Sequence, residues 1–564
     1  MSAPEMAFRL LDAVHLIQDK RQPPRFDAPA SIERPVIWGR AKDAWSDLIP
    51  AWQATYENVR AGRFAWFGIS WPEANPPNWH LDPVSDQSWP TDIFGTDIDY
   101  RHDNAHGDVK FVWELNRLQY LQPIAALAFA SGEAGPADLV RQHVGDWIAR
   151  NPPFIGINWT SGIELALRAV SLIFVGKLVD LGEELNAKLA KSLAAHGYWL
   201  ARYPSRYSSA NNHAIAEGLG LLSIGTALAA SSDAVDWVRR GRAILERESA
   251  RQILSDGVGA EQAVAYQRFT VDMLAMAANL GAATTSGLPR AEAFLAAITD
   301  AGGNAPKIGD DDDGGLFWPS MAPRGAATAP VSDGLLHFPI GGYSVVREGP
   351  LHLVFDHGPL GYLSIAAHGH ADALSIWLHI DGEPVLVDAG TYRYHGAGTV
   401  RDAFRGTAAH NTMTVHGVDQ SEIAGPFNWS RKANARAISV VSSPWAVEAE
   451  HDGYLRRFGC IHRRRVETAG RRRFTVVDTV SGSGGPWPVQ AGFLVAPGQE
   501  IRYDGGVWHI GAKLRLEYNG PLKGEILAAE YSPSMGQILT THRLAFSGVM
   551  SSSDLSRFIF QVAG

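Results

Sequence analysis

Residues 366–412 read AAHGHADALSIWLHIDGEPVLVDAGTYRYHGAGTVRDAFRGTAAHNT, and the rest of the chain is best interpreted outward from them. β-Branched runs on both sides of the turn sequence IDGEPV predict antiparallel strands. Imidazoles and carboxylates are costly to place among such apolar runs unless a partner compensates them. The stretch therefore predicts a polar site in a β-rich domain. Its polar members are His368, His370, Asp372, Asp388, His410 and Asn411.

The composition is that of a globular chain with more than one core. Its 564 residues are too many for a single core, so two or three domains are expected. The net charge of -9 gives no general attraction to nucleic acid. The single cysteine, Cys460, excludes an internal disulfide and a cysteine-based zinc cluster. The sequence contains no apolar run of about 18 residues, so no membrane span is predicted.

The first residues, MSAPEMAFRLLDAVHLIQDKRQPPRF, lack a basic segment followed by a long apolar one. They are therefore not typical of a signal peptide. The sequence as it stands predicts a cytoplasmic protein, and a periplasmic one only if a leader has been removed.

The amino-terminal half is predicted to be helical. Residues 1–105 are irregular with two short helical patterns, 4–19 and 40–61, and we expect them to wrap around the next domain. Residues 106–305 hold about eight patterns with apolar residues at i, i+3, i+4 and i+7, separated by Gly, Pro or Ser. Antiparallel helix pairs follow, arranged as a bundle, a solenoid or a closed toroid.

The carboxyl-terminal half is predicted to be β. Residues 306–336 form a linker whose acidic run, 310–313, favours a solvated turn or a helix cap over a cation site. Across 337–564 the apolar period becomes two, with strand-length runs bounded by Gly or Asp. These runs predict an antiparallel β-sandwich. The fold class is therefore multidomain α + β.

Two helix starts carry candidate site residues. Asn211, Asn212 and His213 open one helix, where an Asn could simply act as a cap. A cap does not need two amides and an imidazole, and helix N-termini favour anions. These side chains could hold a substrate carboxylate. Tyr266 lies near the start of another helix, where a tyrosine is most often a core residue.

A third candidate is the segment NWTSGIELALR. Glu164 and Arg168 are four residues apart, which by itself predicts a surface salt bridge of roughly a few tenths of a kcal/mol. Trp159, expected to be exposed just before the helix, could stack on a sugar ring.

Arginines form a fourth candidate. Arg401 and Arg405 precede His410 and are suited to bind a carboxylate or sulfate. The triplets 463–465 and 471–473 flank a turn, where alternation along the strands would expose some of each triplet. A solvated face is their expected role, with contact to a polyanion as the alternative.

The opening stretch could also bind a metal. Two histidines and an aspartate from separate strands can supply three ligands of a tetrahedral site. In an H-x-H pattern on a strand, both imidazoles share one face. Either both bind one metal, or one binds it and the other points into a neighbouring cleft.

Seven stretches together, in this order, resemble the heparinase II/III family of polysaccharide lyases, over about residues 60–480. They are FVWELNRLQ, NWTSGIELALR, NNHAIAEG, EQAVAYQRF, IGDDDDGG, GHADALSIWLHIDGEPVLVDAG and RGTAAHNT. The resemblance implies an N-terminal (α/α) toroid, often incomplete, followed by an antiparallel β-sandwich. It also implies β-elimination at a uronic acid, in which the C5 proton is removed, the 4-O bond breaks and a 4,5-unsaturated uronate forms.

The resemblance assigns roles to residues. Tyr266 matches the catalytic tyrosine and Asn212 the asparagine that neutralises the uronate carboxylate. Asn211 is the alternative in register, and His213 is a further candidate. His368 matches the histidine that faces Tyr266, either as the base or as a holder of the carboxylate.

The remaining implied residues concern metal and substrate. His370, Asp388 and His410 match structural zinc ligands of the family. Weaker substrate-binding candidates are Asn116, Arg117, Trp159, Glu164, Arg168 and Arg405. The expected partner is an anionic polysaccharide or oligosaccharide of the heparan sulfate, alginate or glucuronan type. The oligomeric state stays open, with a homodimer among the possibilities.

Two alternatives belong to other classes. A non-catalytic glycan-binding envelope protein on the same scaffold would bind glycan without turnover. A glycoside hydrolase would use paired carboxylates, for instance from 310–313, at a spacing of roughly 5–10 Å.

Overall fold

A computed structural model gives the structure of the chain and describes residues 3–26, 32, 45–101, 105–282, 287–321, 332–395, 398–470 and 472–563. The chain divides into two compact units. Unit 1 comprises Met1–Arg251, Phe269–Thr285 and Gly314–Arg324. Unit 2 comprises Gln252–Arg268, Ser286–Asp313 and Gly325–Gly564.

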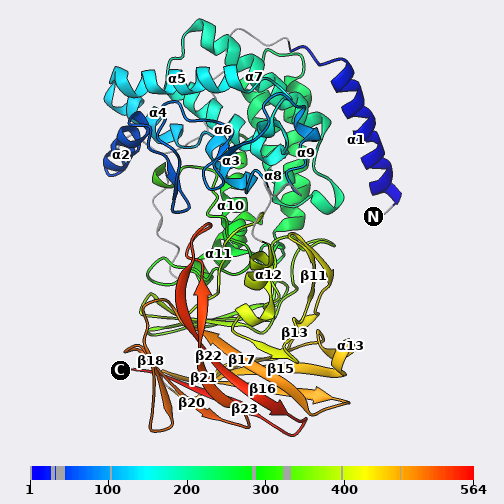
Figure 1. Ribbon diagram of the computed structural model, residues 1–564, viewed down its shortest axis with the longest axis vertical. Helices are drawn as coiled ribbons and strands as arrows, with labels where there is room; N and C mark the ends of the chain where they lie inside the picture. Colours follow the sequence, from blue (N-terminus) through cyan, green and yellow to red (C-terminus); the bar gives the residue numbers. More distant parts are fainter. Residues whose placement is uncertain are drawn as a thin grey trace. The chain divides into compact units, whose positions relative to one another are not determined.

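Unit 1 is helical, as expected (Figure 1). Two short hairpins, β1 (Ala65–Trp66) with β2 (Ile69–Ser70) and β3 (Leu81–Asp82) with β4 (Gln87–Ser88), lie in the segment before α3. Its helices are α1 (Ala3–Arg21), α2 (Ile49–Arg60), α3 (Val109–Asn116), α4 (Leu121–Ser131), α5 (Ala134–Arg150), α6 (Gly162–Leu178), α7 (Glu183–Arg202), α8 (Asn212–Ala227), α9 (Ala234–Gln252) and most of α10 (Val264–Asn279). Among the described residues, no helix is long and apolar enough to cross a membrane.

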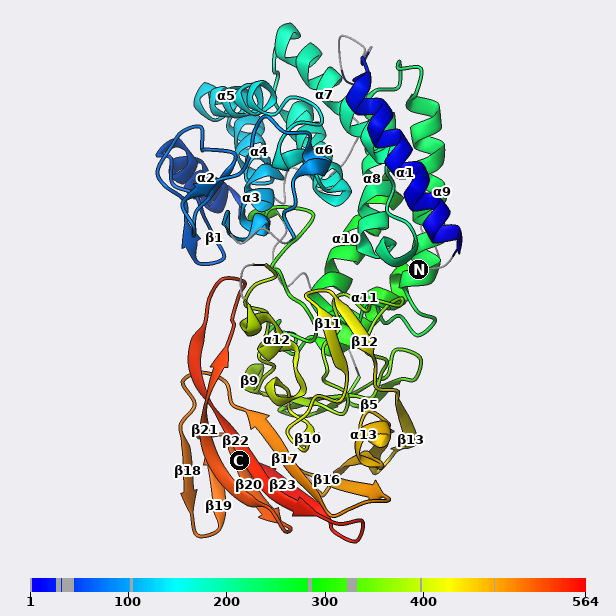
Figure 2. The same cartoon turned by 45° about the vertical axis from the view of Figure 1, so that its right-hand side comes forward.

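The central helices of unit 1 form two layers. Helices α4, α6 and α8 pack against one another in turn, and α5 packs against α7 (Figure 2). In α6 and α8 nearly every side chain is buried, whereas α5 and α7 expose a polar face. An all-round apolar helix belongs inside a packed layer and an amphipathic one outside it. This inner and outer layering is the arrangement of an (α/α) toroid.

One predicted helix is two. The apolar pattern across residues 112–130 predicts a single helix, but the structure breaks it between α3 and α4. Leu118 has a φ of 57°, which ends the first helix. Pro123 is then the third residue of α4, where its missing N–H leaves no helical hydrogen bond unmade.

Unit 2 holds antiparallel sheets, α11 (Leu288–Ile298), α12 (Thr399–Arg405) and α13 (Leu455–Phe458). Three sheets are large, with strand orders β5-β6-β7-β8-β9, β10-β17-β22-β21 and β13-β14-β15-β16-β23-β20-β19-β18, and β11-β12 forms a hairpin. The strands are β5 (Gly334–Phe338), β6 (Tyr343–Glu348), β7 (Leu351–Asp356), β8 (Ile376–Ile380), β9 (Glu383–Leu386), β10 (Met413–Val415), β11 (Glu422–Gly425), β12 (Asn428–Arg431), β13 (Ala435–Ser442), β14 (Trp445–His451), β15 (Cys460–Thr468), β16 (Arg473–Gly482), β17 (Trp487–Leu494), β18 (Ile501–Asp504), β19 (Val507–Ile510), β20 (Leu514–Asn519), β21 (Lys523–Tyr531), β22 (Leu539–Met550) and β23 (Ser556–Val562).

One apolar core joins the three large sheets. It contains Leu353 of the first sheet, Phe546 of the second and Phe558 of the third, each almost fully buried. Sheets that share a core in this way form a sandwich, so the predicted fold class is confirmed.

The arginines of β15 face two directions. Arg463 and Arg465 pair with glutamates on a partly exposed face, as expected. Arg464 points the other way and is fully buried, with two charge-assisted bonds of 2.7 Å to Asp478. Side chains alternate along a strand, so only part of the triplet can be solvated. Alternation was expected to expose only some of each triplet, and Arg464 is the member of 463–465 that is buried.

Residues 40–44 of the second predicted helix and residues 322–331 of the predicted linker lie outside the described residues.

Candidate active site

Unit 2 brings Tyr266 and His368 together. Tyr266 lies in the first turn of α10, and His368 lies in the loop between β7 and β8. Their rings stack with centroids 3.8 Å apart and an interplanar angle of 18°. The Tyr266 hydroxyl is 2.8 Å from that of Tyr394. A phenol and an imidazole thus lie face to face, with a second phenol bound to the first.

Backbone hydrogen bonds tie together the segments that carry these residues. The amide of Asp310 donates to the carbonyl of His368 at 2.9 Å. The amide of Val264, two residues before Tyr266, donates to the carbonyl of Ile308 at 3.1 Å. Three segments distant in sequence are therefore fixed to one another by main-chain bonds, which makes the ring stack a rigid feature.

Asp310 is the centre of the polar network. Its carboxylate accepts from His368 Nδ1 at 3.1 Å and from His370 Nε2 at 3.0 Å, and both terminal nitrogens of Arg401 bind it in a fork. It is fully buried, so the expectation of a solvated turn was wrong at this residue. Burial alone would raise the pKa of Asp310, but Arg401 and the two histidines hold it well below its usual range. The carboxylate is therefore ionised at neutral pH.

The same surroundings set the charge of the stacked pair. Burial, with Asp312 and Asp310 nearby, raises the pKa of Tyr266 well above 10, so its phenol keeps its proton. For His368, burial opposes the charged form, but the hydrogen bond to Asp310 and the charge of Glu261 together raise the pKa. Glu261 Oε2 is 3.5 Å from His368 Nε2.

His368 and His370 lie on a loop rather than on the predicted strand. Gly369 between them has no room for a side chain, because a Cβ there would meet the carbonyl oxygen of Leu360 at 1.6 Å. The glycine lets the loop pack against Leu360 and so directs both imidazoles to Asp310. This close approach explains the glycine in the H-G-H motif.

Replacing Gly369 by alanine is expected to force the loop away from Leu360 and to lower the free energy of unfolding by about 1–3 kcal/mol. Chemical denaturation would measure the change. Gly425→Ala is the matched control, since a Cβ at Gly425 meets nothing within 4 Å. Equal stability of the two variants would contradict the tight packing at Gly369.

The three predicted metal ligands lie together. His370, Asp388 and His410 are buried, and one donor atom from each lies within 4.8 Å of the others. His410 Nδ1 is 2.9 Å from Asp388 Oδ2. His370 Nδ1 and His410 Nε2 are buried and have no hydrogen-bond partner among the described residues. Buried nitrogens without partners are costly, so the cluster fits a cation with nitrogen and oxygen ligands.

The candidate helix start belongs to unit 1. Asn211 is the N-cap of α8, and its side chain accepts from the amide of His213 at 3.2 Å. Asn212 is fully buried, whereas His213 is partly exposed. One turn later, the Glu217 carboxylate accepts hydrogen bonds from the backbone amide and from the hydroxyl of Ser205, each at 2.7 Å. Burial raises the pKa of Glu217 to about 7. Asn211 therefore caps α8, and the catalytic role of Asn212 and His213 stays a prediction.

Three of the weaker candidates belong to a buried ion network in unit 1. Arg117 binds Glu164 through two bonds of 2.7 and 2.8 Å and also pairs with Glu114 at 2.8 Å. Asn116 donates to the carbonyls of Trp79 and Val112 and accepts from Trp147. These contacts hold α3 against α6 and the segment before it, and a role in substrate binding stays a prediction.

Two details of this region were predicted wrongly. Trp159 is fully buried against His196 rather than exposed, so its ring is not available to a sugar here. Arg168 does not make the expected surface salt bridge with Glu164. It is buried, donates to His196 and to two backbone carbonyls, and lies over the ring of Trp147.

Arg405 is also buried. It donates to the carbonyls of Pro426 and Gly425 and lies over the ring of Trp429, so it fixes the β11–β12 hairpin. Substrate binding by Arg405 remains a prediction, and the structure gives this guanidinium a structural task.

The sequence did not single out three members of the network. Tyr394 lies in a loop without a distinguishing pattern, and Glu261 begins the stretch EQAVAYQRF, in which nothing local marks its carboxylate as a partner of an imidazole. Asp310 is one of four consecutive aspartates. The burial of Asp310 depends on Arg401, 91 residues away, which local sequence does not reveal.

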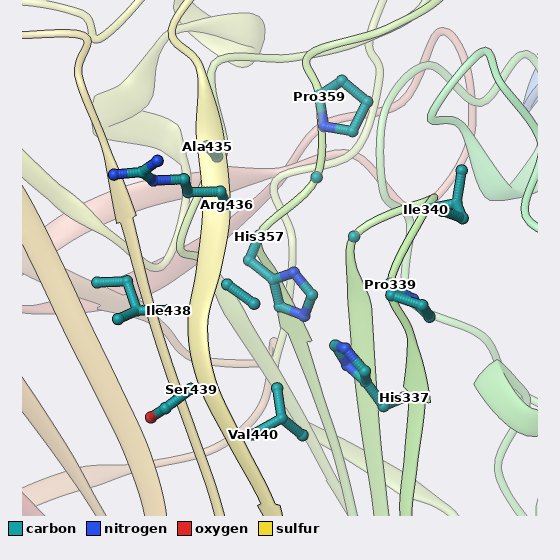
Figure 3. Close-up of a pocket in the computed structure, with 13 residues that line it drawn as sticks. His337, Pro339, Ile340, His357, Pro359, Ala435, Arg436, Ile438, Ser439 and Val440 are labelled. Atoms are coloured by element: carbon teal, nitrogen blue, oxygen red, sulfur yellow. The ribbon is translucent and has the colours of Figure 1, made fainter.

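A cavity of about 380 Å³ lies elsewhere in unit 2, between β13 and the loops at Pro339 and Pro359 (Figure 3). His337 and His357 line it, and the hydroxyl of Ser344 lies 3.0 Å from each imidazole. Burial lowers the pKa of both histidines, to about 3 for His357. Both are therefore neutral and share one buried hydroxyl, and none of the candidate catalytic residues lines this cavity.

Comparison with known sequences identifies the family. The heparinase II/III N-terminus family matches residues 79–299, and the heparinase II/III-like C-terminal family matches residues 331–519. The chain belongs to the heparinase II/III family.

Two curated relatives are similar over much of the chain. The heparin-sulfate lyase of Bacteroides stercoris is 23% identical over 456 residues, which cover 70% of this chain and 65% of that protein. The heparin-sulfate lyase of Bacteroides thetaiotaomicron is 23% identical over 440 residues, covering 68% and 60%. The matched part spans less than two thirds of the length of either relative.

Solved structures share the fold. A crystal structure of heparinase III superposes with a TM-score of 0.65 at 18% identity, covering 94% of this chain and 92% of that one. Heparan sulfate lyase of Pedobacter heparinus gives a TM-score of 0.57 at 16% identity, covering 98% and 87%.

Proposed function

We propose that the chain is a polysaccharide lyase that cleaves a uronic-acid-containing glycosaminoglycan by β-elimination. The observation that carries this proposal is the stack of Tyr266 on His368, backed by Asp310. The names of the two curated relatives, both heparin-sulfate lyases, support an anionic glycosaminoglycan as the substrate.

His368 is the proposed base. Its Nδ1 donates to the ionised Asp310, so in the neutral ring Nε2 carries the lone pair. Nε2 is buried and has no hydrogen-bond partner among the described residues. The raised pKa makes the imidazole a stronger base, and Glu261 stabilises the imidazolium that forms when it takes the C5 proton.

Tyr266 is the proposed acid. Its raised pKa keeps the phenol protonated at neutral pH, as a donor to the departing O4 must be. Tyr394, bound to it at 2.8 Å, orients the hydroxyl and can pass a proton back after turnover. The β-elimination then needs no oxidant and no added water, because the C5–H electron pair becomes the C4–C5 double bond as the C4–O4 bond breaks.

The uronate carboxylate must be neutralised for C5–H to become acidic. Asn212 is the proposed donor, with His213 and Asn211 as neighbours at the same helix start. The positive end of the α8 dipole favours an anion there. Such donors act in the transition state, when charge moves onto the carboxylate.

The metal proposed for His370, Asp388 and His410 is zinc, because two imidazoles and a carboxylate are ligands that zinc accepts. When bound it supplies structural stabilisation, with no part in proton transfer. The bond of His370 Nε2 to Asp310 fixes the tautomer in which Nδ1 can coordinate. Zinc would thereby also steady the carboxylate behind His368.

Removing metal is therefore expected to lower the melting temperature, and added zinc to restore it. At a free concentration of 100 times Kd, one bound ion stabilises by about 2.7 kcal/mol. Calorimetry with and without chelator measures the shift, and His410→Ala should abolish it. His337→Ala, outside the cluster, should keep it. A melting temperature that is unchanged by chelator and by zinc would contradict the proposed metal site.

The function is tested by incubating the zinc-supplied protein with heparan sulfate, hyaluronan, glucuronan and alginate. The conjugated double bond of an unsaturated uronate absorbs in the ultraviolet, so turnover appears as rising absorbance. We expect a signal on at least one uronate polymer, with the glycosaminoglycans favoured. Absence of any signal from the folded protein on all four would refute the proposal.

A further inference from the structure

A cavity of about 340 Å³ in unit 1 is lined by aromatic rings that the catalytic account does not use. Three indoles, of Trp66, Trp71 and Trp318, contribute to its wall. The volume falls at the lower end of the range for small-molecule sites, about 300–1,000 Å³. It is therefore large enough for a sugar ring.

The rings are held in place by the local fold. Trp66 ends the first strand of the β1–β2 hairpin, whose two-residue turn has φ of 54° at Phe67 and 68° at Gly68. Positive φ at both turn residues is the geometry that matches the twist of a tight hairpin. Trp66 meets Trp71 and Trp318 edge-on, with ring centroids 5.1 and 5.3 Å apart.

Trp318 comes from a segment distant in sequence but fixed to the same unit. Its amide donates to the side chain of Gln122 at 2.9 Å. Two residues later, the carbonyl of Ser320 accepts from Trp52 at 3.0 Å. The corner formed by Trp66 and Trp318 is thus built into unit 1, and both rings remain half-buried rather than closed off.

Polar groups accompany the rings. The indole N–H of Trp71 is buried, with 4% of the residue exposed, and has no hydrogen-bond partner among the described residues. Asn58, Arg63 and Glu73 also line the cavity, and Arg63 donates to the amide oxygen of Asn58 at 3.0 Å. A buried donor without a partner is costly, and a ligand hydroxyl would satisfy it.

We propose that this cavity is a second glycan-binding site that takes an uncharged pyranose ring. Aromatic faces pack on the C–H face of a sugar, while the amide, guanidinium and carboxylate reach its hydroxyls. The charged lining groups are one arginine and one glutamate, so they cancel and offer no net attraction to a uronate or a quaternary ammonium ion. In a glycosaminoglycan, the ring that fits is the N-acetylhexosamine that alternates with the uronate.

This assignment rests on the proposed function only for the identity of the polymer. The site would bind hexosamine rings of this polymer, whereas the catalytic pair acts on its uronates. It assigns a binding task to the segment of residues 55–73, for which the lyase chemistry gives none.

The first test uses the N-acetylglucosamine trimer, which has no uronate for the catalytic pair. Tryptophan fluorescence and calorimetry should give a measurable Kd, raised about tenfold in Trp318→Ala and in Ser70→Trp, which fills the cavity and keeps its rings. Trp318→Phe should stay within about threefold. Tyr503→Ala, an exposed aromatic of unit 2, should match the unchanged chain. Circular dichroism would confirm that each variant is folded.

Other outcomes would overturn the proposal. An unchanged Kd in both Trp318→Ala and Ser70→Trp would place trimer binding elsewhere. Tighter binding of glucuronate or of choline, lost in the same variants, would assign the cavity to a charged ligand. Absence of trimer binding by the unchanged chain would also refute it.

A second test separates this proposal from the lyase proposal. A hexasaccharide of alternating glucuronate and N-acetylglucosamine should bind a Tyr266→Phe background about tenfold more weakly once Trp318→Ala is added. If the unchanged chain turns over substrate but Trp318→Ala does not weaken hexasaccharide binding, the second site is refuted and the lyase proposal is not. If Trp318→Ala weakens hexasaccharide binding but the unchanged chain forms no unsaturated product, the lyase proposal is refuted and the second site is not.

Discussion

Replacing Tyr266 by phenylalanine is expected to lower kcat by about 10²–10⁴-fold, the usual contribution of a positioned acid or base. The variant keeps the ring that stacks on His368 and loses only the hydroxyl bound to Tyr394. The stack and the fold should therefore persist, and the loss should appear in kcat rather than in KM. Initial rates of ultraviolet absorbance over a range of substrate concentrations would measure both.

Tyr394→Phe is the matched control for this experiment. It removes the other hydroxyl of the same 2.8 Å pair. If Tyr266 donates the proton and Tyr394 only orients it, the control should lose much less activity. A Tyr266→Phe variant with wild-type kcat, or a Tyr394→Phe variant that loses more, would contradict the assignment of the acid.

Replacing Asp310 by alanine is expected to cost about 3–5 kcal/mol of stability, because it leaves a buried guanidinium without its carboxylate. Arg401 is 3% exposed, and its fork to Asp310 lies beneath the rings of Tyr394 and Phe427. The same change removes the partner of His368 Nδ1, so any folded fraction should also lose activity. Urea denaturation at neutral pH would measure the loss of stability.

Asp402→Ala separates this effect from a generic loss of charge. Asp402 lies on α12 with about half of its side chain exposed, and it pairs with Arg405 at 3.8 Å. Asp402 is half exposed and its contact is long, while buried Arg405 keeps its bonds to two backbone carbonyls, so the expected loss is only about 0–1 kcal/mol. Asp310→Gln keeps hydrogen-bonding capacity without the charge. Its stability should lie between the stabilities of Asp310→Ala and Asp402→Ala. Equal stability of Asp310→Ala and Asp402→Ala would show that Asp310 does not hold the network together.

Much of the fold was predictable because it depends on local periodicity. The helical period of α5 to α9 and the period of two across β5 to β23 reflect which side chains each element buries. The exception at Leu118 depends on one backbone angle, and the apolar pattern continues across it. A periodic pattern reports burial, and it does not report where a buried chain turns.

The site was predictable only in part. The family resemblance pointed to Tyr266 and His368 as partners, and the structure stacks their rings. The exposure of Trp159 and the bond between Glu164 and Arg168 were wrong, because spacing along a helix does not show what packs over it. Asp310 looked like a member of a solvated acidic run, since its partner Arg401 lies far along the chain.

The mass of the products tests the central claim most directly. β-Elimination splits a polymer without adding water, so the fragment masses sum to the mass of the parent chain. Hydrolysis adds one water for each bond broken. Mass spectrometry of a defined glycosaminoglycan oligosaccharide after incubation should show fragments that sum to the substrate, with the missing water at the new non-reducing end. Fragments whose masses sum to the substrate plus one water for each bond broken would contradict a lyase and favour a hydrolase on the same fold.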